Sequence, residues 1–139
     1  MKKIKNIRRK IITTVCMGLL VCSTVALAAP LGYVSYRLPV LQGNNYTNTH
    51  DKTTKTANVE NKVTALSFAN AANFWVEKPG GADLTTKYSQ RVSSSYTTLA
   101  FYNGSLNSSA AVGSQVLMAM ENVAASSTTG FVSGYVDFK

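Results

Sequence analysis

Apolar and polar side chains alternate along much of the chain between residue 32 and its end, and this period of two is typical of β-strands that bury one face. The alternation is clearest in residues 32–38, 95–102 and 131–138. In residues 95–102 it places Leu99 and Phe101 on the more apolar face. These segments predict antiparallel strands with one face toward a core and one toward solvent.

Residues 73–78 predict a further strand, which ends at a Pro-Gly-Gly sequence whose backbone preferences suit a chain reversal. The alternation in this strand places Phe74 and Val76 on the core face. Trp75 and Glu77 then lie on the opposite face.

Weaker strand signals surround these segments. Residues 63–68 are expected to form a strand that turns Leu66 and Phe68 inward, and residues 87–92 another that pairs nearby. The Thr-rich residues 52–58 follow a polar, turn-like stretch and predict a polar strand or an extended loop.

Residues 110–125 are compatible with two structures. Their good helix formers allow a helix of about four turns. Against the helix, Gly113 interrupts its start and residues 115–123 alternate. One face of that alternation carries Val116, Met118 and Met120. The alternation favours a strand.

Together these segments predict an all-β fold. We expect a small antiparallel β-sandwich of about six to eight strands after an N-terminal signal helix, since short strands follow one another with Gly, Pro, Asn and Ser turns between them. A barrel-like closure of the same strands is the alternative.

The first 28 residues have the features of a secretion signal peptide. Six basic residues within 1–10 precede an apolar run over 11–27, and Ala26 and Ala28 supply the small side chains that signal peptidase requires. A proline directly after the cleaved bond fits the peptidase poorly, so Pro30 favours a cut after Ala28 that leaves Ala29 first. The remaining chain is expected to form a single domain.

Two other outcomes for this segment stay open. Residues 11–29 could remain as a membrane anchor, although several Ser, Thr and Gly residues interrupt them and no stop-transfer pattern flanks them. Lipid attachment at Cys22 would need a small residue just before it, where the chain has Val21.

Removal of the segment changes the charge of the protein. The full chain has 14 basic and 6 acidic residues and a net charge of +8, but six of the basic residues lie within 1–10. The remaining eight are scattered and leave a net charge near +2, so nucleic acid is not an expected partner. Cys16 and Cys22 also lie in the segment, and an exported domain without cysteines is typical of Gram-positive bacteria.

The chain carries no recognisable catalytic, metal or cofactor motif. The single histidine, His50, lies in the polar stretch of residues 44–56 next to Asp51 and is expected to be a solvated loop residue. No serine has a Gly-x-Ser-x-Gly setting. The acidic residues stand apart from one another, mostly beside basic residues, which is typical of a solvated surface. We therefore expect a non-enzymatic protein without metal or cofactor.

The sequence Tyr36 to Asn44, a Thr-rich stretch, and the closing Val132 to Val136 resemble small exported proteins of Gram-positive bacteria that are uncharacterised. This resemblance implies an all-β fold and an extracellular location, and it implies no activity.

The aromatic side chains offer the one candidate site. If the more apolar face of each strand points inward, five aromatic side chains lie on outward faces, where rings can stack on sugars or anchor a protein partner. They are Tyr33 and the four proposed binding residues Trp75, Tyr96, Tyr102 and Tyr135. The alternative is that these rings fill the core, because a register error of one residue inverts a strand.

These features favour a secreted or cell-wall-associated binding or structural module, with a cell-wall glycan or a protein as partner and membrane contact only through the signal segment before cleavage. The alternative is a bacteriocin-like antimicrobial or toxin-like effector, which the small size, export and weak positive charge would suit. Growth inhibition by the purified domain would distinguish the two.

The signal segment generates the first testable prediction. Mass spectrometry of the exported protein should give a chain that begins at Ala29 or Pro30, because cleavage is expected at the small residues before them. A full-length chain held in the membrane, or a lipid on Cys22, would contradict it.

Overall fold

The computed structural model of this protein describes residues 29–139; the predicted signal segment, with Ala26 and Ala28 of the cleavage site, lies outside the described residues. The described chain forms nine strands and three 3₁₀ turns. The strands are β1 (Leu31–Leu38), β2 (Asn45–Tyr46), β3 (His50–Asp51), β4 (Asn58–Ser67), β5 (Ala72–Glu77), β6 (Tyr88–Gln90), β7 (Thr97–Ala100), β8 (Gln115–Asn122) and β9 (Gly130–Asp137). The turns are η1 (Val40–Gln42), η2 (Gly104–Leu106) and η3 (Ser108–Ala110).

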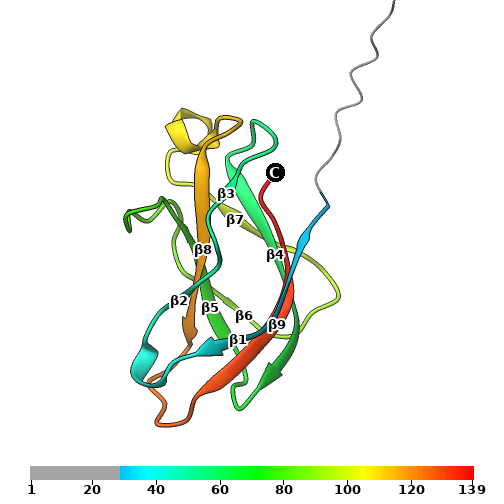
Figure 1. The fold of residues 1–139 in the computed structure, drawn as a ribbon, viewed down its shortest axis with the longest axis vertical. Coiled ribbons are helices and arrows are strands. Elements are labelled where there is room, and N and C mark those ends of the chain that lie inside the picture. Colours follow the sequence, from blue (N-terminus) through cyan, green and yellow to red (C-terminus); the bar gives the residue numbers. More distant parts are fainter. Residues whose placement is uncertain (1–28) are drawn as a thin grey trace, which may run out of the picture.

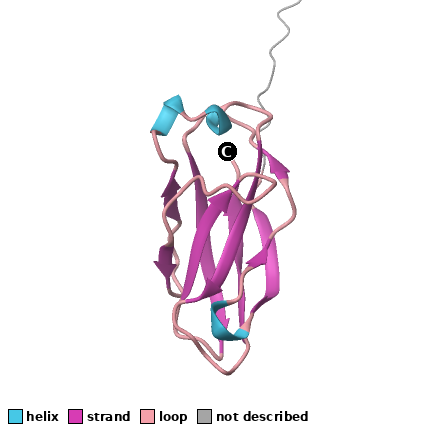
Figure 2. Cartoon of the chain, turned by 90° about the vertical axis from the view of Figure 1, so that its left-hand side faces the viewer, coloured by secondary structure: helices cyan, strands magenta, loops and turns pink. Residues whose placement is uncertain are grey.

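The strands form two antiparallel sheets in a sandwich-like arrangement (Figure 1). One sheet has four strands in the order β1-β9-β4-β7. The other has five, in the order β2-β8-β5-β6 with β3 also paired to β8. Figure 2 shows η1 at one end of the strands and the other two turns at the opposite end. The all-β prediction is confirmed, but the number of strands exceeds the expected six to eight, because β2 and β3 are two-residue strands in a region expected to be polar turn.

The core lies between the sheets and draws on both of them. Phe74 and Val76 of β5 are fully buried, as are Val59 of β4 and Leu99 of β7. The described residues 29–139 build both sheets and a core cluster that joins them, so this part of the chain supplies a core of its own.

The ambiguous residues 110–125 contain the strand β8, so the favoured interpretation is correct. Val116, Met118 and Met120 are fully buried on one face of β8, as the alternation predicted. The helix formers in this segment are overridden because β8 pairs along its length with β5.

In β1 the predicted alternation holds at Leu38, which is buried, but fails before a bulge. Its pairing with β9 shifts register between Tyr33 and Tyr36, and Ser35 has a φ of 53°, so the strand contains a bulge. Tyr33, expected on an outward face, is buried, and its hydroxyl donates a hydrogen bond to Oδ1 of Asn61 at 2.9 Å. Val34 is exposed instead. One extra residue in a strand reverses the faces of the residues on one side of it relative to those on the other.

The ring of Tyr33 lies against β9 at Gly134, the residue that pairs with it. A Cβ at Gly134 would collide with the Tyr33 hydroxyl and with the backbone oxygen of Lys62. Glycine at this position therefore makes room for the tyrosine ring within the core.

The prediction for Phe68 is also wrong. Leu66 is partly buried against the core as expected, but β4 ends at Ser67 and Phe68 turns outward with a φ of 58°. Its side chain is 75% exposed.

The two residues that follow β7 provide a test of the core. Phe101→Ala should lower the free energy of unfolding by about 3 to 5 kcal/mol, because Phe101 is buried in the core. Tyr102→Ala should cost clearly less, because Tyr102 is 45% exposed. Urea denaturation of both variants measures the difference, and a larger cost at Tyr102 would contradict the observed packing.

Candidate functional site

Two of the four proposed binding residues meet on the outward face of the four-stranded sheet. Tyr135 of β9 pairs across the sheet with Lys62 of β4, and Tyr96 directly precedes β7. The Lys62 Nζ lies 4.9 Å from the centre of the Tyr96 ring and 5.2 Å from that of Tyr135. Tyr96 is 38% exposed and Tyr135 45% exposed. We name these three residues the Tyr–Lys face.

Charged groups border the Tyr–Lys face on the side of the C-terminus. Lys139 Nζ lies 2.9 Å from an oxygen of Glu60 and 3.8 Å from one of Asp137. The hydrogen bond with Glu60 raises the pKa of Lys139, with smaller contributions from the nearby charges of Asp137 and Tyr96. The two lysines and two carboxylates balance, so the surface offers donors and acceptors without net charge.

The opposite border of the Tyr–Lys face is open. Gly32 of β1 pairs with Tyr135, and a Cβ there would touch the tyrosine ring at 3.6 Å. The Gly32 position therefore adds no side chain over the ring.

Sequence reasoning missed Lys62. The signal that could have found it is the alternation of Val59, Asn61 and Val63, all buried, with Glu60 and Lys62 facing outward between them.

Tyr102 lies outward as predicted but apart from the Tyr–Lys face. It follows the end of β7, and its backbone N–H donates to the carbonyl of Leu84 while its own carbonyl accepts from Asn107. It belongs to the loops near η2.

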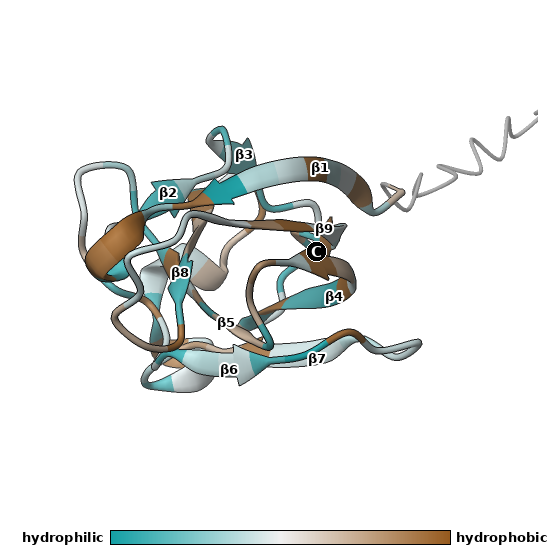
Figure 3. Ribbon diagram, turned by 90° about the horizontal axis from the view of Figure 1, so that it is seen from below, coloured by the Kyte–Doolittle hydropathy of each residue, from teal (hydrophilic) through white to brown (hydrophobic). Residues whose placement is uncertain are grey.

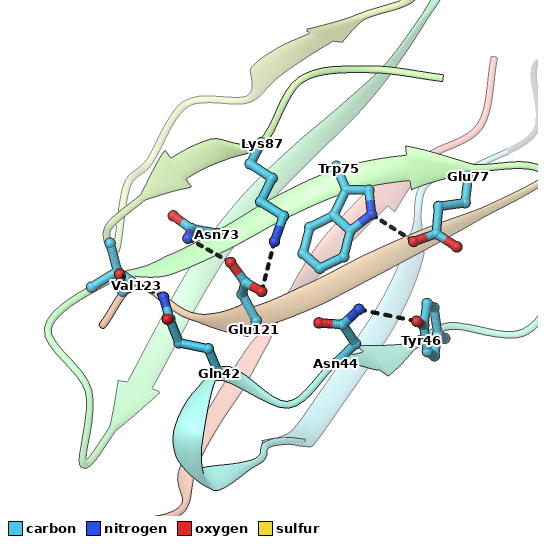
Figure 4. Close-up of polar contacts among 9 residues, drawn as sticks. All are labelled: Gln42, Asn44, Tyr46, Asn73, Trp75, Glu77, Lys87, Glu121 and Val123. Carbon is cyan, nitrogen blue, oxygen red and sulfur yellow. Dashed lines mark hydrogen bonds and ion pairs between the residues drawn. The ribbon is translucent and has the colours of Figure 1, made fainter. Parts of the chain in front are cut away.

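Trp75 lies on the outward face of the other sheet, as the alternation predicted, but its expected exposure is wrong: the side chain is 1% exposed. Figure 4 shows the neighbours that enclose it. The indole N–H donates to Glu77 at 2.6 Å, and Lys87 Nζ lies 4.4 Å from the ring centre. Lys87 is in turn held by Glu121 at 2.8 Å. These polar groups cover the ring, so Trp75 is not available to a partner.

Glu77 and Glu121 share this outward face with Trp75, which raises the question of paired acids. Glu121 also accepts a hydrogen bond from Asn73, which lies four residues from Glu77 along β5. Four residues of strand span about 13 Å, so the two acids lie at different points along the sheet face. Each carboxylate instead has a structural partner.

His50 lies in β3 and not in a loop. Its ring stacks on Phe138 with 4.7 Å between ring centres, beside a hollow of about 190 Å³ that Asp51 and Asp137 also line. Within residues 29–139, no three His, Cys, Asp or Glu side chains gather in a group suited to a metal ion.

Lys52, next to this hollow in sequence, is almost completely buried. Its Nζ donates to the carbonyl of Asn58 at 2.8 Å and to the Thr56 hydroxyl at 3.2 Å, and it lies 5.3 Å from the centre of the Phe101 ring. Burial lowers the pKa of Lys52 to about 8, and the charge of Asp137 acts in the opposite direction. A buried lysine in this polar segment was not predicted.

Comparisons with known proteins add no identification: no family model, no curated protein and no solved structure matches this chain. In the part of the chain that the structure describes, no helix has the length and apolar character needed to cross a membrane.

Lys52 generates a prediction about pH. The unfolded chain binds its proton up to about pH 10.5 and the folded chain only up to about pH 8, so stability should rise between these values by at most about 1.4 kcal/mol per pH unit. Burial raises the pKa of Tyr33, whose ionisation in the unfolded chain opposes this gain above pH 10.

Urea unfolding of the native protein and of Lys52→Met between pH 8 and pH 10 measures the effect. Lys52→Met should lose the upward slope. A slope equal in both proteins would contradict the assignment to Lys52.

Proposed function

We propose that the protein is an exported, non-enzymatic module that binds a cell-wall glycan through the Tyr–Lys face. The observation that carries the proposal is the position of Lys62 between two exposed tyrosine rings on one sheet face. Sugars present C–H groups that stack on aromatic rings and hydroxyls that need donors and acceptors. The Tyr–Lys face supplies the aromatic rings for stacking and the polar groups for hydrogen bonds.

The rings are already positioned for such a ligand. Tyr135 is held by strand pairing, and the cation–π contacts with Lys62 restrain both rings. A site that needs little ordering loses less entropy when it binds.

The charge of the surface favours one kind of glycan. Lys62 and Lys139 are balanced by Glu60 and Asp137, so a strongly anionic polymer gains no net attraction. We therefore propose the amino-sugar strands of peptidoglycan as the ligand in preference to teichoic acid.

Binding of residues 29–139 to purified Gram-positive cell walls tests the proposal. Tyr135→Ala and Lys62→Ala should each weaken binding by about thirtyfold, the effect of removing a central binding side chain. Tyr102→Ala is the matched control, because Tyr102 has the same exposed fraction as Tyr135 but lies off this face. Melting temperatures establish that the variants remain folded.

Walls stripped of teichoic acid should bind as well as intact walls. Loss of binding on stripping would overturn the choice of peptidoglycan. Equal losses in Tyr102→Ala and Tyr135→Ala would overturn the site itself.

A further inference from the structure

Three loops meet at the end of the sandwich that carries η1, which is the lower end in Figure 1. They are the loop around η1, the turn between β4 and β5, and the loop between β8 and β9. Each holds one large apolar side chain toward solvent: Leu41 is 74% exposed, Phe68 75% and Val123 43%. We name these three side chains the apolar loop end.

Hydrogen bonds hold the loop around η1 against the end of β8 and the loop that follows it. The Leu41 N–H donates to the carbonyl of Ser126 at 2.9 Å, and the Gln42 amide donates to that of Val123 at 3.3 Å. Asn122 donates to the carbonyl of Pro39 at 3.0 Å. Leu41 and Val123 therefore lie on loops that hydrogen bonds hold together.

The backbone at two of these side chains argues against a purely structural role. Leu41 has a φ of 54° and Phe68 a φ of 58°, in the left-handed region that glycine and asparagine favour and bulky residues avoid. Neither side chain is buried, so core packing does not compensate for the unfavourable backbone. Strained residues of this kind concentrate at sites of function.

The charges of the domain are distributed unevenly between its two ends. Five of the six acidic residues lie toward the other end: Asp51, Glu60, Glu77, Asp83 and Asp137. The sixth, Glu121, is 4% exposed and paired with Lys87. Arg37 at the end of β1 and Arg91 directly after β6 are exposed beside the apolar loop end. This end is apolar at its tips and positive around them.

We propose that the apolar loop end docks on an anionic membrane surface. Apolar side chains that enter the boundary between headgroups and acyl chains, with basic residues near the headgroups, are the combination that holds proteins on such surfaces. The view from below in Figure 3 shows hydrophobic colouring on η1, which faces outward at this end. Phe68 and Val123 also line a common hollow of about 190 Å³ between their loops, so the apolar side chains of this end belong to one surface that a lipid layer can cover.

This contact goes beyond the proposed glycan binding and uses a different part of the domain. It also departs from the expectation that only the signal segment touches a membrane. With the Tyr–Lys face on the side of the sandwich, the domain can contact wall and membrane with separate surfaces.

Co-sedimentation of residues 29–139 with lipid vesicles tests the proposal. Vesicles that contain phosphatidylglycerol should bind the protein, and pure phosphatidylcholine vesicles should bind it more weakly. Leu41→Asn and Phe68→Asn should each weaken binding at least about tenfold, since each removes an inserted apolar side chain. Asparagine suits the left-handed backbone, so these variants should melt no lower than the native protein.

Two controls sharpen the test. Leu106→Asn removes an 88% exposed leucine from η2 at the other end and should leave binding unchanged. Arg37→Gln and Arg91→Gln should each weaken binding about fivefold, and added salt should reduce the loss.

No binding to either kind of vesicle, or an equal loss in Leu106→Asn, would overturn the proposal. Equal binding to both kinds of vesicle would overturn the assignment of anionic lipid. A dimer of residues 29–139 that Phe68→Asn dissociates, without vesicle binding, would show that the apolar loop end joins two copies of the chain instead.

Discussion

The contact of Tyr33 with Gly134 sets the register on which the outward surface of the four-stranded sheet depends. The tyrosine ring occupies space that only a glycine leaves free, and its hydroxyl is fixed by Asn61 on β4, the strand beyond β9. This places β1, β9 and β4 in one alignment. A shift of β9 by a single residue would turn Tyr135 into the core and expose Val136. The Tyr–Lys face therefore depends on an interaction on the other side of its own sheet.

The two sheets differ in how far the aromatic side chains on their outward faces are exposed to solvent. The five-stranded sheet encloses the outward ring of Trp75 beneath Lys87, with Glu77 on the indole N–H and Glu121 on the lysine, although Tyr46 on the same face is 43% exposed. The four-stranded sheet leaves both rings beside Lys62 partly exposed. The same residue types, aromatic, lysine and glutamate, thus make a closed cluster on one sheet and an open surface on the other. Closure in the first case comes from the ion pair of Lys87 with Glu121 and from the hydrogen bond of Trp75 with Glu77.

Where strands are regular, the sequence predicted both that they form and which of their side chains point into the core. Alternation alone placed Phe101 inward and Tyr135 outward, because each lies in or next to a segment without insertion. It failed for Tyr33, where a bulge adds a residue, and for Phe68, where the strand ends one residue earlier. A period of two says nothing of where a strand bends or stops. The positions of bulges and strand ends follow from contacts with other strands.

The burial of Trp75 and Lys52 could not be predicted from the sequence, for a different reason. Each side chain is covered by groups brought from elsewhere in the chain, such as Glu121 near Trp75 and Phe101 near Lys52. Local polarity describes only the immediate neighbours of a residue. The fold determines which distant groups surround it.

The enclosure of Trp75 has a practical consequence for spectroscopy. This is the one tryptophan in the chain, and it lies outside the main core beneath a lysine and beside a carboxylate. Its emission should respond when the five-stranded sheet opens and Lys87 separates from the ring. It should be insensitive to a ligand that occupies the other sheet. The protein thus contains an optical reporter of its own unfolding that is separate from the proposed glycan site.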